Sequence, residues 1–198
     1  MHALTVDHHV EPPSTTGIPH DKMGMWVFLC SEIMFFTGLI GAYLVLRFSA
    51  PSWPDPSKVL NIPLTAMNTF ILICSSVTMV QALAAIGRGD ARKMKLFLSL
   101  TLMFGAGFLS VQAYEYNKLL FHEHFTPSSS LFGSVFFTTT GFHGFHVFCG
   151  VVSMAFVTGK AFLGKYTQAS HQGIETLGLY WHFVDLVWII LFTIIYLF

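Results

Sequence analysis

The chain has 198 residues, of which 54% are hydrophobic and only 10% carry a charge, whereas soluble domains carry about 25% charged residues. This number of charged residues is too small to cover the surface of a soluble globule of this length. Much of the surface is therefore expected to face lipid. Ten Lys and Arg balance ten Asp and Glu. This balance argues against nucleic acid as a partner, because binding to phosphates needs a basic patch. The composition predicts an integral membrane protein.

Five stretches are apolar over the roughly 20 residues that a membrane-spanning helix needs. They are residues 23–46, 62–86, 94–116, 131–159 and 176–198. A β-barrel is the rival architecture, but its strands would alternate in polarity and be half as long. The sequence predicts an all-α bundle of five transmembrane helices in one domain, 23–198. The polar tail that precedes it, 1–22, lacks the features of a secretory signal.

Lys and Arg fall unevenly on the two sides of the predicted bundle. With the N-terminus inside, the inner segments hold Lys22, Arg88, Arg92, Lys93, Lys95, Lys160 and Lys165, and the outer segments hold Arg47, Lys58 and Lys118. Inner loops of membrane proteins carry the excess of positive charge. The expected orientation therefore has the N-terminus in the cytoplasm and the C-terminus outside.

Glu32 lies within the first predicted span, in CSEIMFF. A charged carboxylate at mid-bilayer costs roughly 2.5–3.5 kcal/mol even on the lenient insertion scale. Three interpretations stay open. The side chain is protonated and hydrogen-bonded to a neighbouring helix, or it pairs with a histidine or a lipid amine, or it exchanges protons with a neighbouring subunit.

Two histidines, His143 and His146, lie three residues apart in the fourth span, in GFHGFHV. This spacing places them on one helix face. Metal or haem ligation together with His182 is one interpretation, and polar contacts where helices approach closely is the other. In the fifth span, LYWHFVDLVW places His182 and Asp185 at i, i+3, which predicts a hydrogen bond between imidazole and carboxylate. Glu115 is expected to be solvated near the membrane surface.

The sequence offers no self-sufficient catalytic or metal site. We find no phosphate-binding loop, nucleophile elbow or HExxH motif. Cys30, Cys74 and Cys149 lie in different spans without a CxxC, so neither a disulfide framework nor a cysteine-based zinc site is expected. Polar groups on four of the five predicted helices point to an accessory subunit that meets partners in the membrane.

Several segments, taken in order, resemble subunit III of the haem–copper terminal oxidases. They are CSEIMFFTGLIGAY, MNTFILICSSVTM, GDARKM, QAYEY, GSVFFTTTGFHGFHV and GLYWHFVDLVWIILF. The resemblance implies a non-redox subunit beside subunit I, which holds the haems and copper, reduces dioxygen to water and pumps protons. Subunit III would stabilise subunit I, bind phospholipid and support proton uptake. The resemblance also implies that the chain lies in a bacterial inner membrane, contacts other oxidase subunits and is part of a larger respiratory supercomplex.

The resemblance also implies roles for individual residues. Glu32 matches the buried acid of the family, and the recurring polar positions are Glu115, His143, His146, Glu175, His182 and Asp185. Lys160 matches a basic residue that holds a lipid phosphate, with Lys165 as a second contact. On physical grounds, Arg88, Arg92 and Lys93 suit anionic lipid headgroups. Neither a catalytic nor a metal-binding residue is expected in this chain.

The chain matches the short five-helix form of the family, because it lacks two N-terminal helices that form one wall of the lipid cleft in longer members. A cytochrome c oxidase is the expected complex. The alternatives are a quinol oxidase, an accessory of nitric oxide reductase and, most remotely, a haem-binding electron carrier. Outer residues His122, Glu123 and His124 are either solvated or bind a metal. The inner histidines His8, His9, His20 and His171 are either solvated or collect protons.

Overall fold

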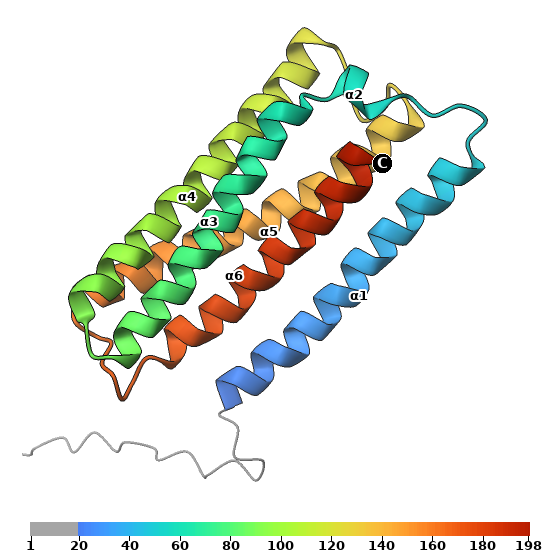
Figure 1. Ribbon diagram of the computed structural model, residues 1–198. Helices are drawn as coiled ribbons and strands as arrows, with labels where there is room; N and C mark the ends of the chain where they lie inside the picture. The colour runs from blue at the N-terminus through green and yellow to red at the C-terminus, as the bar shows by residue number, and fades with distance from the viewer. Residues whose placement is uncertain (1–19) are drawn as a thin grey trace, which may run out of the picture.

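Five long helices make up most of the computed structural model, which describes residues 20–198 (Figure 1). They are α1 (His20–Ser49), α3 (Ile62–Gly87), α4 (Ala91–Asn117), α5 (Leu131–Phe162) and α6 (Gln172–Leu191). Each is long and apolar enough to cross a membrane. The predicted fold class, an all-α bundle of five transmembrane helices, is confirmed, and the β-barrel alternative is wrong.

Short helical segments extend or connect these spans. Helix α2 (Pro56–Val59) lies between α1 and α3. Helix α4 continues as the π-helical segment η1 (Lys118–His122), and α6 continues as η2 (Phe192–Leu197). The helices therefore reach beyond several predicted span boundaries. Of the polar tail predicted at 1–22, residues 1–19 lie outside the described part, and α1 already begins at His20.

Side-chain caps explain where three of the helices begin. The Asn61 side chain accepts a hydrogen bond from the Leu64 amide at 3.2 Å, which begins α3. Asp90 caps α4 by accepting from the Lys93 amide at 3.0 Å, and this bond holds the pKa of the Asp90 carboxyl below its usual range. Ser130 caps α5 through the Gly133 amide at 2.9 Å. Such caps satisfy amides that have no partner within the helix.

Helices α3 to α6 pack as a four-helix bundle, and α1 lies along its flank (Figure 1). In the bundle, α3 contacts α4 and α6, and α5 contacts the same two helices. Helix α1 contacts α6 and α5. The four-helix bundle therefore forms the core of the molecule, and α1 is an added helix.

Trp181 of α6 fills the centre of the four-helix bundle. A β-carbon built on Gly105 of α4 would lie 2.6 Å from the Trp181 ring, and one built on Gly150 of α5 would lie 2.8 Å from it. The indole N–H donates to the Ser75 hydroxyl of α3 at 2.9 Å. Two helical turns further along α6, Trp188 donates in the same way to Thr69 at 2.9 Å. Glycine on α4 and α5 is needed because the indole takes the space of a side chain.

Helix α1 packs on the bundle along one narrow line of residues. Leu29, Phe36 and Tyr43 are its buried apolar residues, and they are spaced seven apart. A repeat of seven keeps one stripe of a helix against its neighbour. Glu32 lies three residues after Leu29 and therefore falls on this stripe. The packing of α1 thus carries a carboxylate to the boundary with α5.

Candidate functional site

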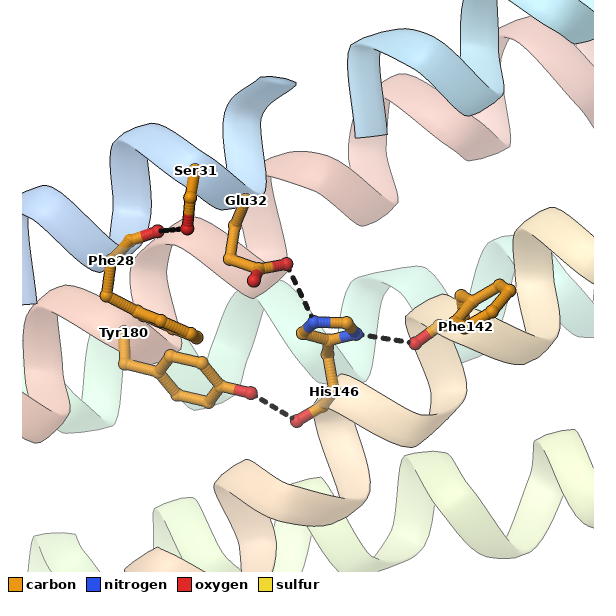
Figure 2. Close-up of polar contacts among 6 residues, drawn as sticks. All are labelled: Phe28, Ser31, Glu32, Phe142, His146 and Tyr180. Carbon is orange, nitrogen blue, oxygen red and sulfur yellow. Dashed lines mark hydrogen bonds and ion pairs between the residues drawn. The ribbon is translucent and has the colours of Figure 1, made fainter. Parts of the chain in front are cut away.

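Glu32 of α1 meets His146 of α5 in the membrane-spanning part of the molecule (Figure 2). A carboxylate oxygen of Glu32 lies 2.9 Å from His146 Nε2. The two side chains are 17% and 14% exposed, respectively. Of the three interpretations of Glu32, the structure favours pairing with a histidine. Among the described residues, it is the one side-chain hydrogen bond that joins these two helices.

The other ring nitrogen of His146 fixes its tautomer. His146 Nδ1 lies 2.7 Å from the backbone carbonyl oxygen of Phe142. A carbonyl oxygen only accepts hydrogen bonds, so Nδ1 must carry a proton. Nε2 then either accepts a proton from neutral Glu32 or donates one to its carboxylate. The contact between Glu32 and His146 therefore holds one proton, which can reside on either side chain.

Aromatic residues surround this contact. The ring of Phe36 meets the imidazole edge-on at 5.1 Å between centroids, and Phe35 lies 6.2 Å away. Tyr180 of α6 donates its hydroxyl to the His146 carbonyl oxygen at 2.8 Å. Figure 2 shows Tyr180 and Phe28 beside each other, to the left of the contact. These groups fix the backbone of α5 and limit the approach of lipid to the shared proton.

A groove between α1, α5 and α6 begins at Phe28 and Tyr180, beside this contact, and leads towards the first turns of α1 and α6. Its volume is about 480 Å³, and its lining is mainly apolar, with Phe28 and Tyr180 at one end and Gly173 and Thr176 at the other. At that other end Lys22 forms an ion pair with Glu175. His171 Nε2 lies 3.2 Å from the same carboxylate. Glu175 thus ties the start of α1 to the start of α6.

The same end of the bundle gathers seven basic residues, and we call it the basic end. It is formed by the start of α1, the turn between α3 and α4, and the loop between α5 and α6. The Gln168 side chain joins the last two by donating to the Gly87 carbonyl oxygen at 2.8 Å. Its basic residues are Lys22, Arg88, Arg92, Lys93, Lys95, Lys160 and Lys165. The grouping expected from the sequence is therefore present, and it contains all the candidate lipid-binding residues.

The candidate lipid-binding residues are exposed at this end. Arg88, Arg92, Lys93, Lys160 and Lys165 all have exposed side chains. Lys160 also borders an apolar hollow of about 570 Å³ on the outer side of α5, lined by Val152, Phe156 and Leu163. A cation at the rim of an apolar hollow suits a lipid, because the cation can pair with the anionic headgroup while the hollow receives an acyl chain.

His143 does not share the surroundings of His146. Its side chain is fully buried inside the four-helix bundle, and neither ring nitrogen has a hydrogen-bond partner within the described residues. Its ring stacks on Trp188 at 4.8 Å and meets Phe108 edge-on at 6.1 Å. The two histidines three residues apart therefore contact different helices.

The predicted hydrogen bond between His182 and Asp185 is wrong. Asp185 is 7% exposed, and its Oδ2 accepts instead from the Ser76 hydroxyl of α3 at 2.6 Å. No hydrogen bond joins His182 and Asp185 in the described chain. Spacing along one helix brings two side chains near each other, but the hydroxyl on the facing helix lies closer to the carboxylate.

The expectation that Glu115 is solvated is also wrong. The side chain is 5% exposed and accepts a hydrogen bond from the Thr65 hydroxyl of α3 at 3.0 Å. The helix continues past Tyr116 to His122, so Glu115 lies about two turns before its end. The later helix end places this carboxyl inside the bundle.

The structure also shows the surroundings of three further groups of residues: the outer residues 122–124, the cysteines and the inner histidines. Glu123 pairs with Lys118 at 3.1 Å, beside His122 and His124. Residues 20–198 contain no group of three His, Cys, Asp or Glu side chains placed to hold a metal ion. All three cysteines are free. His8 and His9 of the proposed proton-collecting group lie outside the described residues, whereas His20 is exposed and His171 contacts Glu175.

Sequence reasoning missed Lys22 and Ser76 as partners of polar residues. Lys22 precedes Leu29 by seven residues, so the repeat of Leu29, Phe36 and Tyr43 could have placed it on the packing line of α1. Ser76 carries no such signal, because a serine in an apolar helix most often bonds its own backbone.

Comparison with known proteins identifies the family. The model of the family "Cytochrome c oxidase subunit III" matches residues 5–198. A probable cytochrome c oxidase subunit 3 of Nocardia farcinica is 41% identical over 176 residues, covering 88% of this chain and 86% of the relative. The subunit 3 of Corynebacterium diphtheriae is 42% identical over 178 residues, covering 88% and 86%. That of Thermostichus vulcanus is 37% identical over 196 residues, covering 98% and 93%. The chain belongs to the cytochrome c oxidase subunit III family.

Proposed function

We propose that this chain is the non-redox subunit III of a bacterial cytochrome c oxidase, embedded in the inner membrane beside the subunit that holds haem and copper. The names of its relatives support a cytochrome c oxidase over a quinol oxidase or nitric oxide reductase. Haem and copper belong to the partner subunits in this proposal. The complex reduces dioxygen to water and pumps protons, and this chain stabilises it.

The basic end supports an orientation with the N-terminus in the cytoplasm. Seven of the ten Lys and Arg residues lie at this end, and positive residues collect on the cytoplasmic side of membrane proteins. Arg88, Arg92, Lys93, Lys160 and Lys165 would then meet the anionic headgroups of the inner leaflet. This arrangement supports the binding of phospholipid.

The contact between Glu32 and His146 is the observation that carries the proposed support of proton uptake. The contact holds one proton within the membrane-spanning part of the chain, and the Glu32 and His146 side chains that share it are exposed to a similar extent. A carboxylic acid with imidazole, and a carboxylate with imidazolium, differ only in the place of that proton. The groove towards the basic end lies on the cytoplasmic side in the proposed orientation. The proton can move between the two side chains without changing the net charge of the pair.

Purification of the native complex and replacement of Glu32 test this proposal. We expect the chain to co-purify with a haem-bearing subunit, and Glu32→Gln to leave assembly intact while slowing turnover or altering its dependence on pH. Ser31→Ala is the matched control, because the Ser31 hydroxyl only donates to the Phe28 carbonyl of its own helix at 2.7 Å. Identical pH profiles for wild type and Glu32→Gln would reduce Glu32 to a packing role.

The haem-carrier alternative gains no support from the geometry. His143 faces the interior between Trp188 and Phe108, whereas His146 faces Glu32. A reduced-minus-oxidised spectrum of the purified chain tests it directly. We expect no haem absorbance, and a Soret band would contradict the proposed division of roles.

A further inference from the structure

Two polar side chains of α6, His182 and Asp185, have polar atoms without a hydrogen-bond partner near the middle of its span. The Oδ1 atom of Asp185 is buried and accepts no hydrogen bond within the described residues. His182, one turn earlier, is half-buried and forms no hydrogen bond in that part of the chain. At 1.5 Å per residue, His182 and Asp185 lie about 15 Å and about 20 Å from the start of α6. Both are therefore far from either membrane surface.

The surface around these two residues is apolar and open. The bond from Ser76 to Asp185 sets the register of α3 against α6. One turn either side of Ser76 are Ile73 and Val80, which are 39% and 51% exposed. Beside Asp185 are Leu186, which is 57% exposed, and Ile189, which is 36% exposed. We call the surface formed by Ile73, Val80, His182, Leu186 and Ile189 the α3–α6 face.

Lipid alone is a poor neighbour for this face. At mid-membrane depth the acyl chains offer neither hydrogen-bond donors nor acceptors. A polar group that contacts them without a partner therefore destabilises the protein by roughly several kcal/mol. Ionisable residues at this depth mostly face protein or a water-filled cavity. Glu32 and His146 satisfy this rule within the chain, whereas His182 and Asp185 do so only in part.

The outer face of α5 shows the contrasting case. Phe142, Phe145 and Phe156 are 44%, 61% and 70% exposed. Thr138, the polar residue one turn before Phe142, donates its hydroxyl to the Ser134 carbonyl of its own helix at 2.7 Å. This face has the chemistry of a surface that meets acyl chains.

We propose that a transmembrane helix of another oxidase subunit covers the α3–α6 face and presents a hydrogen-bonding side chain to His182. The inference rests on the proposed function, because it requires that the chain be part of a membrane complex. The partner helix packs against Val80 and Leu186, and its polar group forms a hydrogen bond with the His182 imidazole.

Site-specific photo-crosslinking in native membranes tests the identity of the neighbour. A benzophenone amino acid is placed at Leu186 on the α3–α6 face and, as the matched control, at Phe145 on the outer face of α5. After irradiation we expect the Leu186 variant to form a covalent adduct with the mass of a second subunit, and the Phe145 variant to form lipid adducts only. Lipid adducts alone at Leu186, or subunit adducts at Phe145 alone, would overturn the proposal.

Replacing His182 gives an independent measurement. His182→Phe keeps the ring but removes both nitrogens, and we expect at least two-fold less of this chain to remain with the haem-bearing subunit in mild detergent. Thr193→Val is the control on the same helix, because the Thr193 hydroxyl donates to its own Ile189 carbonyl at 2.8 Å. Equal retention of wild type and His182→Phe would remove His182 from the interface. If wild type itself failed to co-purify, the proposed function would fail instead.

Discussion

The packing of α1 differs from the packing inside the four-helix bundle. Inside the bundle, large rings fill spaces left by glycine and donate to hydroxyl groups of the facing helix, as Trp181 does to Ser75. Along α1, Gly24, Gly38 and Gly41 have no neighbouring atom within 4 Å of a β-carbon position. Helix α1 is held instead by a single line of residues and by polar contacts such as Glu32 with His146.

This difference separates two uses of polar groups within one membrane protein. The polar groups of the bundle interior are mostly neutral hydroxyl and indole pairs, which fix how the helices fit together. The α1 contacts are between ionisable groups, which can change their protonation without repacking a core. Proton handling is therefore expected at the boundary of α1, and mechanical stability is expected from α3 to α6.

The largest expected effect is the loss of the Trp181 ring. Trp181→Ala removes a fully buried side chain, and large-to-small changes of this kind destabilise by about 3–5 kcal/mol. We expect the melting temperature of the purified chain in detergent to fall strongly. Trp26→Ala on α1 is the control, because Trp26 is 54% exposed. Equal melting temperatures for the two variants would contradict the contrast between core and flank.

The second expected effect comes from crowding the same ring. Gly105→Ala places a β-carbon 2.6 Å from Trp181, whereas Gly107→Ala on the same helix meets no atom within 4 Å. Overpacking costs about 1–3 kcal/mol, so only Gly105→Ala should lower the melting temperature. Gly105→Ala as stable as wild type would show that the indole can move aside.

The smallest expected effect on stability concerns the ion pair of α1 at the basic end. Lys22→Met removes the partner of Glu175 while keeping an apolar stem, and both side chains are 32% exposed. Such half-exposed pairs contribute no more than about 1 kcal/mol. We expect a small loss of stability that disappears in high salt, measured against Lys58→Met. A loss as large as that of Trp181→Ala would mean that α1 is part of the core.

The sequence predicts the helices well, because length and hydropathy decide which segments cross a membrane. It also places Glu32 and His146 in spans, but it leaves the partner of Glu32 open, since the contact depends on how α1 packs against α5. The errors have the same origin. Asp185 bonds Ser76 on another helix rather than His182 on its own, and Glu115 is buried because α4 extends to His122 through η1. Contacts between helices are not encoded in the spacing along one helix.

The most direct test of the central claim is a double-mutant cycle on oxidase turnover measured across pH, with Glu32→Gln, His146→Gln and the double variant in the assembled complex. If one proton shared by Glu32 and His146 supports proton uptake, each single variant should change the pH profile as much as the double variant does. Effects that simply add, or profiles that match wild type throughout, would contradict a shared proton at this contact.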